Sequence, residues 1–123
     1  MREERLKTTA GLRGTPALPL SAWRGRSGRR YVVGVHPAGA FDLDEMAEAV
    51  VIAVRRDDTG IAEMVSVATS NESPRDHLRR TWLDRVRNSG ATELHVHRLA
   101  DDAAERVAIV NDLQLDTVEP AQV

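Results

Sequence analysis

The sequence predicts an α+β domain, in which a four- or five-stranded, mostly antiparallel sheet is covered on one face by two main helices. Three observations predict this fold. Short apolar and β-branched runs joined by Gly-containing turns indicate antiparallel strands. Two longer segments, 74–88 and 101–114, have helix-capping residues at their starts and apolar residues at helical spacing. The chain has 123 residues, of which 41% are hydrophobic, and this suffices for the core of one domain.

The chain is expected to consist of a flexible basic arm (1–17), a single α+β domain (18–118) and a tail (119–123). Residues 8–16 mix Gly, Pro, Thr and charge without a hydrophobic period, which is typical of a flexible arm. Residues 1–30 hold eight basic and two acidic side chains, whereas the remaining residues hold nine basic and seventeen acidic ones. The N-terminal region is therefore suited to an acidic partner.

The domain is predicted to begin with two strands. Residues 18–23 contain Pro19, which an edge strand tolerates because one side of such a strand needs no ladder hydrogen bonds. The Gly25-Arg26-Ser27-Gly28 segment then supplies two residues that accept a positive φ, as a hairpin turn requires. Residues 30–36 are β-branched and aromatic and end at Pro37, which predicts a second strand.

A strand buried on both faces is predicted in the middle of the chain. Residues 41–48 begin with the capping candidate Asp42 and predict one or two helical turns. Residues 49–54 are apolar at every position, which is typical of a central strand. A polar turn at 55–60 and a further strand at 61–69 complete a hairpin.

The last third of the domain is predicted as helix, strand and helix. A Ser-Pro pair begins the helix 74–88, whose apolar stripe consists of Leu78, Trp82, Leu83 and Val86. Residues 92–99 alternate as a strand does. Asp101 or Asp102 is expected to cap the helix 101–114.

Several function classes are excluded or disfavoured by what the sequence lacks. The absence of Cys excludes disulfides, thiolate metal sites and thiol nucleophiles. The longest apolar run has six residues, and the N-terminus leads into no signal-peptide core, so a soluble cytoplasmic protein without membrane contact is expected. No nucleophile elbow, nucleotide-binding Gly loop or Walker-type Lys is present. These absences favour a non-catalytic binding or regulatory module without a cofactor.

The leading candidate site is basic and binds nucleic acid or an acidic protein. Four arginines surround the predicted Gly-containing turn and two more lie on the predicted helix 74–88: Arg24, Arg26, Arg29, Arg30, Arg79 and Arg80. Guanidinium groups and turn amides together suit phosphate oxygens. The chain has few aromatic residues, so contact with a nucleic-acid backbone is favoured over base stacking. A homodimer formed through an edge strand or an uncovered sheet face is compatible with this pattern.

Histidines form an alternative site, either a metal sensor or a small enzyme. His95 and His97 are two residues apart on a predicted strand and therefore share one face. If both helices cover the opposite face, these imidazoles point outward and can chelate a divalent metal or act as acid and base. His36 is a candidate third ligand, and a carboxylate from a neighbouring strand would complete the site.

Residues 49–120 resemble the GIY-YIG nuclease domain in layout: a two-strand hairpin, an Arg-rich helix, a strand, and a helix that ends at Asp112-Leu113. The paired tyrosines and glycines of that family are absent from 50–53 and 65–68, and Val110 or Asn111 stands where its metal-binding Glu is expected. The family's helical Arg corresponds to Arg79 or Arg80. The resemblance implies an inactive relative that retains nucleic-acid or protein binding.

Overall fold

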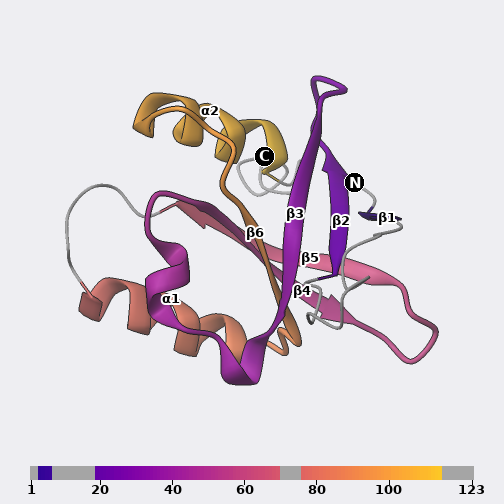
Figure 1. Ribbon diagram of the computed structural model, residues 1–123. Helices are drawn as coiled ribbons and strands as arrows, with labels where there is room; N and C mark the ends of the chain where they lie inside the picture. Colours follow the sequence, from indigo (N-terminus) through magenta and orange to yellow (C-terminus); the bar gives the residue numbers. More distant parts are fainter. Residues whose placement is uncertain (1–2, 7–18, 70–75, 115–123) are drawn as a thin grey trace, which may run out of the picture.

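The computed structural model describes residues 3–6, 19–69 and 76–114, and within these ranges the chain forms a six-stranded sheet and two α-helices (Figure 1). The strands are β1 (Glu3–Leu6), β2 (Leu20–Arg24), β3 (Arg30–Pro37), β4 (Val50–Arg56), β5 (Ala62–Thr69) and β6 (Glu93–His97). The helices are α1 (Asp76–Asn88) and α2 (Ala103–Leu113), and two short 3-10 helices, η1 (Ala38–Ala40) and η2 (Leu43–Met46), lie between β3 and β4. The α+β class is confirmed.

The strand order is β1-β2-β3-β6-β4-β5, and every neighbouring pair is antiparallel. The expectation of four or five strands is corrected to six because residues 3–6 form β1. This strand pairs with β2 in a register that runs from Glu3 opposite Trp23 to Leu6 opposite Leu20. Residues 3–6 are therefore part of the sheet and not of a flexible arm. The rest of the predicted arm, from residue 7, and the predicted tail at 119–123 lie outside the described residues.

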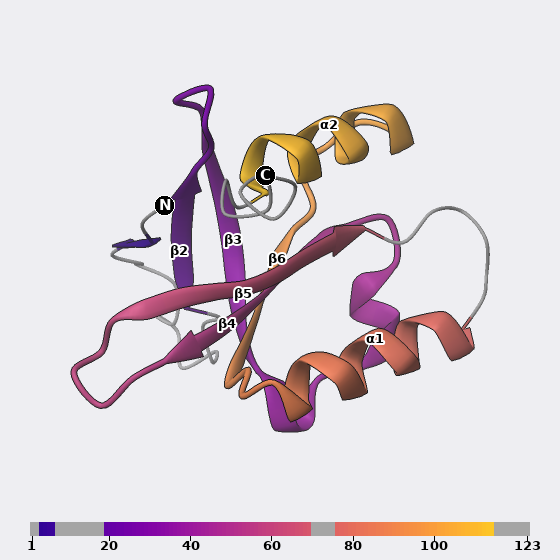
Figure 2. The same ribbon diagram turned by 180° about the vertical axis from the view of Figure 1, so that it is seen from behind.

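The two α-helices lie on opposite sides of the sheet, so the prediction that both cover one face is wrong (Figures 1 and 2). The core under α1 includes Trp82, Leu83 and Val86 of that helix. The core under α2 includes Ile109 and Leu113. A sheet covered on both sides needs apolar residues on both faces of its central strands.

Strand β4 supplies both cores, and this explains its continuous apolar run. Val51 and Ala53 pack in the core under α1, whereas Val50, Ile52 and Val54 pack in the core under α2. All five side chains are fully buried. The prediction of a central strand covered on both faces is confirmed.

The sheet curls strongly. β1 and β4 are separated by three strands in the sheet order, yet Glu3 on β1 forms an ion pair with Arg56 on β4 at 2.8 Å. The two side chains meet above β6 because both project from the α2 face of the curled sheet. Figures 1 and 2 show β2 and β3 crossing β4 and β5 at a steep angle. The curl brings charged groups that are distant in sequence into contact.

Local capping agrees with the sequence. The Asp102 side chain accepts a hydrogen bond from the Glu105 backbone N–H at 2.8 Å, as an N-cap of α2 does. The Asp42 side chain accepts from the Asp44 N–H at 3.0 Å and begins η2. Among the described residues, no helix is long and apolar enough to cross a lipid bilayer.

Candidate functional site

The hairpin between β2 and β3 carries four of the predicted basic residues at its tip. The Gly25 N–H donates to the Arg29 carbonyl at 2.8 Å, and the Gly28 N–H donates to the Gly25 carbonyl at 3.0 Å. Gly28 has a φ of 94°, which residues with a side chain rarely adopt. The loop is thus a tight turn closed by a left-handed glycine, as the Gly-x-x-Gly spacing predicted.

Asp112, the penultimate residue of α2, fixes this turn. Its carboxylate accepts from the Ser27 N–H at 2.8 Å, from the Ser27 hydroxyl at 2.7 Å and from the Tyr31 hydroxyl at 2.7 Å. Burial acts to raise the pKa of Asp112, but these hydrogen bonds outweigh it and lower the pKa. A Cβ at Gly25 would collide with the Asp112 carboxylate, so a side chain there would displace the carboxylate from the turn. We call this set of contacts the Asp112 clamp.

The clamp occupies the anion-binding position that the turn was predicted to offer. The Ser27 amide and hydroxyl, which could hold a phosphate, hold the chain's own carboxylate. The sequence suggested Asp112 only as part of a family resemblance, and its position beside Tyr31, 81 residues away, had no local signal.

The four arginines of the tip are all exposed, and each has a contact that restrains its side chain. Arg26 donates to the Asn111 carbonyl at 2.8 Å. Arg24 donates to the Gly28 carbonyl at 2.7 Å, and the Arg29 guanidinium lies 5.5 Å from the centre of the Tyr31 ring. Arg30 forms an exposed ion pair with Glu4 at 3.1 Å. We call Arg24, Arg26, Arg29 and Arg30 the hairpin arginines.

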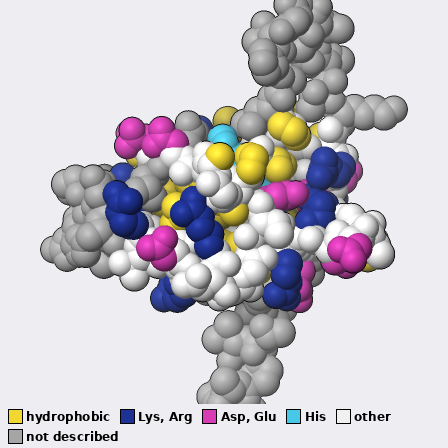
Figure 3. All heavy atoms as spheres, turned by 90° about the horizontal axis from the view of Figure 1, so that it is seen from below, with side chains coloured by type: hydrophobic (Ala, Val, Ile, Leu, Met, Phe, Trp, Pro, Cys, Tyr) yellow, Lys and Arg dark blue, Asp and Glu magenta, His cyan; other side chains and the backbone are white. Residues whose placement is uncertain are grey.

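Arg79 and Arg80 do not belong to the same surface. Both lie on α1, which Figures 1 and 2 place on the opposite side of the sheet from the hairpin tip. Arg79 is half-buried and Arg80 is exposed. Figure 3 views the molecule from the side of α1 and shows basic and acidic side chains interspersed there. The structure therefore groups the four hairpin arginines and separates them from the two on the helix.

The predicted trio of histidines does not come together. His36 lies opposite Leu94 in the β3–β6 register. Its ring packs edge-on against the Phe41 ring on the α1 face, with 5.4 Å between the ring centres. His95 and His97 lie on the α2 face and are buried, with exposed fractions of 0% and 5%. The expectation that they point outward is wrong: on the curled sheet, the Trp23 ring packs beside His95 and the Tyr31 ring packs against His97.

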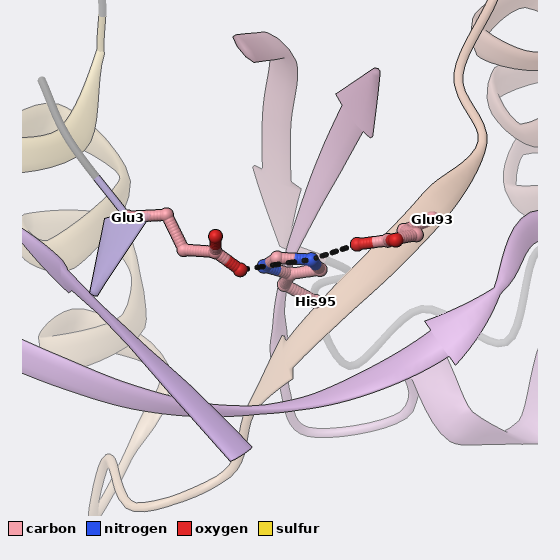
Figure 4. Close-up of side chains that lie close together, drawn as sticks. All are labelled: Glu3, Glu93 and His95. Atoms are coloured by element: carbon pink, nitrogen blue, oxygen red, sulfur yellow. Dashed lines mark hydrogen bonds and ion pairs between the residues drawn. The ribbon is translucent and has the colours of Figure 1, made fainter. Parts of the chain in front are cut away.

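His95 belongs instead to a largely buried cluster with Glu3, Arg56 and Glu93, which we call the Arg56 cluster. Figure 4 shows three of its members, Glu3, Glu93 and His95. Arg56 donates to Glu93 Oε2 at 2.8 Å and Oε1 at 2.9 Å, and to Glu3 Oε2 at 2.8 Å. The Ser21 hydroxyl donates to Glu3 at 2.7 Å. Figure 4 shows the two carboxylates reaching the imidazole from different strands.

The cluster shifts the acid–base behaviour of its members. Hydrogen bonds from Arg56 are the main cause of the low pKa of Glu93, which is about 2. Burial acts to raise the pKa of Glu3, but hydrogen bonds from Arg56 and Ser21 lower it overall. Burial acts to lower the pKa of His95, and this effect outweighs the opposite effect of the two carboxylates, so the pKa is lowered overall. At neutral pH the cluster therefore contains two carboxylates, one guanidinium and a neutral imidazole.

Trp23 fixes which ring nitrogen of His95 carries the proton. The Trp23 indole N–H donates to His95 Nδ1 at 2.9 Å, so Nδ1 must be unprotonated. The proton of the neutral ring is therefore on Nε2, which donates to Glu93 Oε1 at 2.9 Å. Trp23 and His95 are both fully buried.

Glu3, Glu93 and His95 are close enough to resemble a metal site, but their chemistry does not fit one. A metal on Nε2 of a neutral imidazole requires the proton on Nδ1, where the Trp23 N–H already points. The Arg56 guanidinium also occupies both carboxylates and would repel a divalent cation. Arg56 supplies the positive charge that balances the two carboxylates, and the cluster is a closed ion network.

Sequence reasoning identified His95 but missed its partners. The spacing of Glu93 and His95 places both on one face of β6, and this signal was present. The sequence pattern predicts an arm at Glu3 and a turn at Arg56. These residues are 53 positions apart, and no local sequence signal connects them.

The chain was compared with known proteins, and no family model, curated protein or solved structure matches it. The resemblance of residues 49–120 to the GIY-YIG nuclease domain stays a prediction.

Proposed function

We propose that this protein is a non-catalytic binding module that contacts the phosphate backbone of a nucleic acid through the hairpin arginines. The observation that carries the proposal is the exposure of Arg24, Arg26, Arg29 and Arg30 on one tight turn. Guanidinium groups form strong, geometrically defined hydrogen bonds with phosphate oxygens.

The rigidity of the tip supports this role. Asp112 holds Ser27 and Tyr31, and the Arg26 guanidinium donates to the Asn111 carbonyl at 2.8 Å, so the turn is anchored to the end of α2. An anchored turn presents its cations with little further loss of conformational entropy on binding. The hairpin tip projects beyond the sheet in Figures 1 and 2, where a polymer can approach it.

The charge of the remaining chain limits the size of the contact. The whole chain has a net charge of -2, so basic surface is concentrated and not general. If all four hairpin arginines replace counterions, the slope of log K against log salt is about -3.6. Binding to duplex DNA should then weaken by about 150-fold between 50 and 200 mM salt.

Titration of labelled duplex DNA and duplex RNA at these two salt concentrations tests the proposal. Arg24→Gln/Arg29→Gln should halve the salt slope, because two of four contacts are removed while the clamp is retained. Arg80→Gln/Arg85→Gln is the matched control, since it removes the same charge from exposed positions on α1. Absence of binding at 50 mM salt, or equal losses in both double variants, refutes the nucleic-acid proposal and leaves an acidic protein as the partner class.

A cytoplasmic location and a homodimer are further parts of the proposal. Nucleic acid is abundant in the cytoplasm. The edge strand β5 contains Glu63 as its one charged residue, and an edge with so little charge supports pairing with a second copy. Sedimentation at increasing protein concentration tests the dimer, and a constant monomer mass contradicts it.

A further inference from the structure

Arg106 is a buried arginine on the side of α2 that faces the sheet. It shares this side with Ile109 and Leu113, which pack in the core under α2. The residue is 5% exposed, and its Nε atom is buried without a hydrogen-bond partner. No hydrogen-bond partner for this Nε atom is found in the part of the chain that the structure describes.

Burying a guanidinium nitrogen without a hydrogen-bond acceptor is costly. Arginine keeps its charge at every physiological pH, so it cannot escape burial by losing a proton as lysine can. Arg56 shows how this protein treats another poorly exposed guanidinium: it donates to Glu3, to Glu93 and to the Gly60 carbonyl. Arg106 has no equivalent set of acceptors among the described residues.

Three acidic residues of α2 and its N-terminus, Asp102, Glu105 and Asp112, have other partners. The Asp102 side chain caps the Glu105 N–H, and the Glu105 carboxylate accepts from the Asp101 N–H at 3.3 Å. Asp112 is held in the clamp. These carboxylates are therefore not available to Arg106 without breaking a cap or the clamp.

We infer that Arg106 is the receptor for a small oxyanion, a carboxylate or phosphate group, that binds at the sheet-facing side of α2. The planar guanidinium supplies two parallel N–H donors that match such a group. The apolar residues beside Arg106 would exclude water and strengthen the contact. This site is separate from the hairpin arginines, and neither proposal depends on the other.

Thermal unfolding at constant ionic strength tests the inference. Chloride is replaced stepwise by inorganic phosphate in one series and by citrate in another, and the two series separate a phosphate from a carboxylate preference. The Tm of the natural chain should rise by several degrees and saturate in the series that matches the site, because a ligand of the folded state raises stability by mass action. Arg106→Met should abolish this rise, while Arg80→Met, at an exposed position on α1, should retain it.

A second measurement keeps the inference testable if Arg106→Met does not fold. Isothermal titration of the natural chain with phosphate and with citrate should give one saturable site, and Arg106→Lys should weaken it at least tenfold because the paired donors are lost. The inference is wrong if no anion raises the Tm more than chloride does, or if Arg106→Met retains the full response. A last test introduces Asp116→Asn/Glu119→Gln into the natural chain and into the Arg106→Met variant, both in chloride. The inference is also wrong if this double substitution lowers the Tm of the natural chain but not that of Arg106→Met, since the chain's own carboxylates would then be the partner of Arg106.

Discussion

Substitution of Arg56 by Met tests the energetic role of the Arg56 cluster most directly. The side chain has an exposed fraction of 15%, against 6% for Glu3 and 18% for Glu93. Removing the cation leaves two poorly solvated carboxylates without their counter-charge, and breaking such a pair costs about 3–5 kcal/mol. The pKa of Glu93 gives a second measure: it is about 2, whereas the ordinary pKa of a glutamate is 4.5. With about 1.4 kcal/mol for each tenfold change in the ionisation constant, the difference corresponds to roughly 3 kcal/mol.

The sign of the pH dependence follows from the lowered pKa. In the natural chain the stabilisation by ionised Glu93 is fully present above pH 4.5 and is lost as the pH falls toward 2. In Arg56→Met the carboxylate loses the main cause of its low pKa, so acid removes little stability. The difference in unfolding free energy between the two proteins should therefore be about 3 kcal/mol at pH 7 and less than half of that at pH 3.

Urea unfolding at pH 7 and pH 3, followed by tryptophan fluorescence, measures both differences. Arg55→Met is the matched control, because Arg55 is the neighbouring residue of β4 but forms an exposed pair with Glu63, with exposed fractions of 49% and 65%. Exposed pairs contribute about 0–1 kcal/mol. A loss below 1 kcal/mol in Arg56→Met, or a loss that is the same at both pH values, would refute the reasoning.

Two further predictions concern the Asp112 clamp and the metal alternative. Gly25→Ala should lower the free energy of unfolding by about 1–3 kcal/mol, because the new Cβ displaces the Asp112 carboxylate. Gly39→Ala is the control and should have a small effect, since among the described residues no atom beyond its chain neighbours lies within 4 Å of its Cβ position. Equal losses of unfolding free energy in chemical denaturation would contradict this account. Zinc, nickel and manganese should leave the Tm unchanged, because Trp23 holds Nδ1 of His95 and fixes the proton on Nε2; a metal-dependent rise that His95→Gln removes would show that the cluster binds a metal.

The strand and helix pattern could be predicted because its signals are local. The uniform apolar run at 49–54 predicted a central strand, and it also implied that both faces of the sheet are covered. The prediction of a single covered face came from the run of strands joined by short turns, which is typical of an antiparallel sheet with its helices on one side. The histidines are buried because Trp23, Glu93 and the Val32 carbonyl provide hydrogen-bond partners.

The candidate sites could be predicted only in part. The hairpin arginines lie within seven residues of one another, so a glycine-marked turn was enough to group them. The Arg56 cluster and the Asp112 clamp depend on contacts across 37 to 85 residues, which are set by strand order and curl. Strand order is a property of the whole fold, and no spacing in the sequence indicated that β1 joins the sheet.

The position of β6 between β3 and β4 has a consequence for synthesis on the ribosome. The β2–β3 and β4–β5 hairpins are each local in sequence, but β6 is the strand that joins them, and it begins at Glu93. A nascent chain that has emerged only as far as α1 therefore holds two unconnected hairpins with exposed edges. Because such edges associate with other chains, the protein should depend on rapid completion of its last quarter, and a stalled or truncated product that ends before β6 should aggregate.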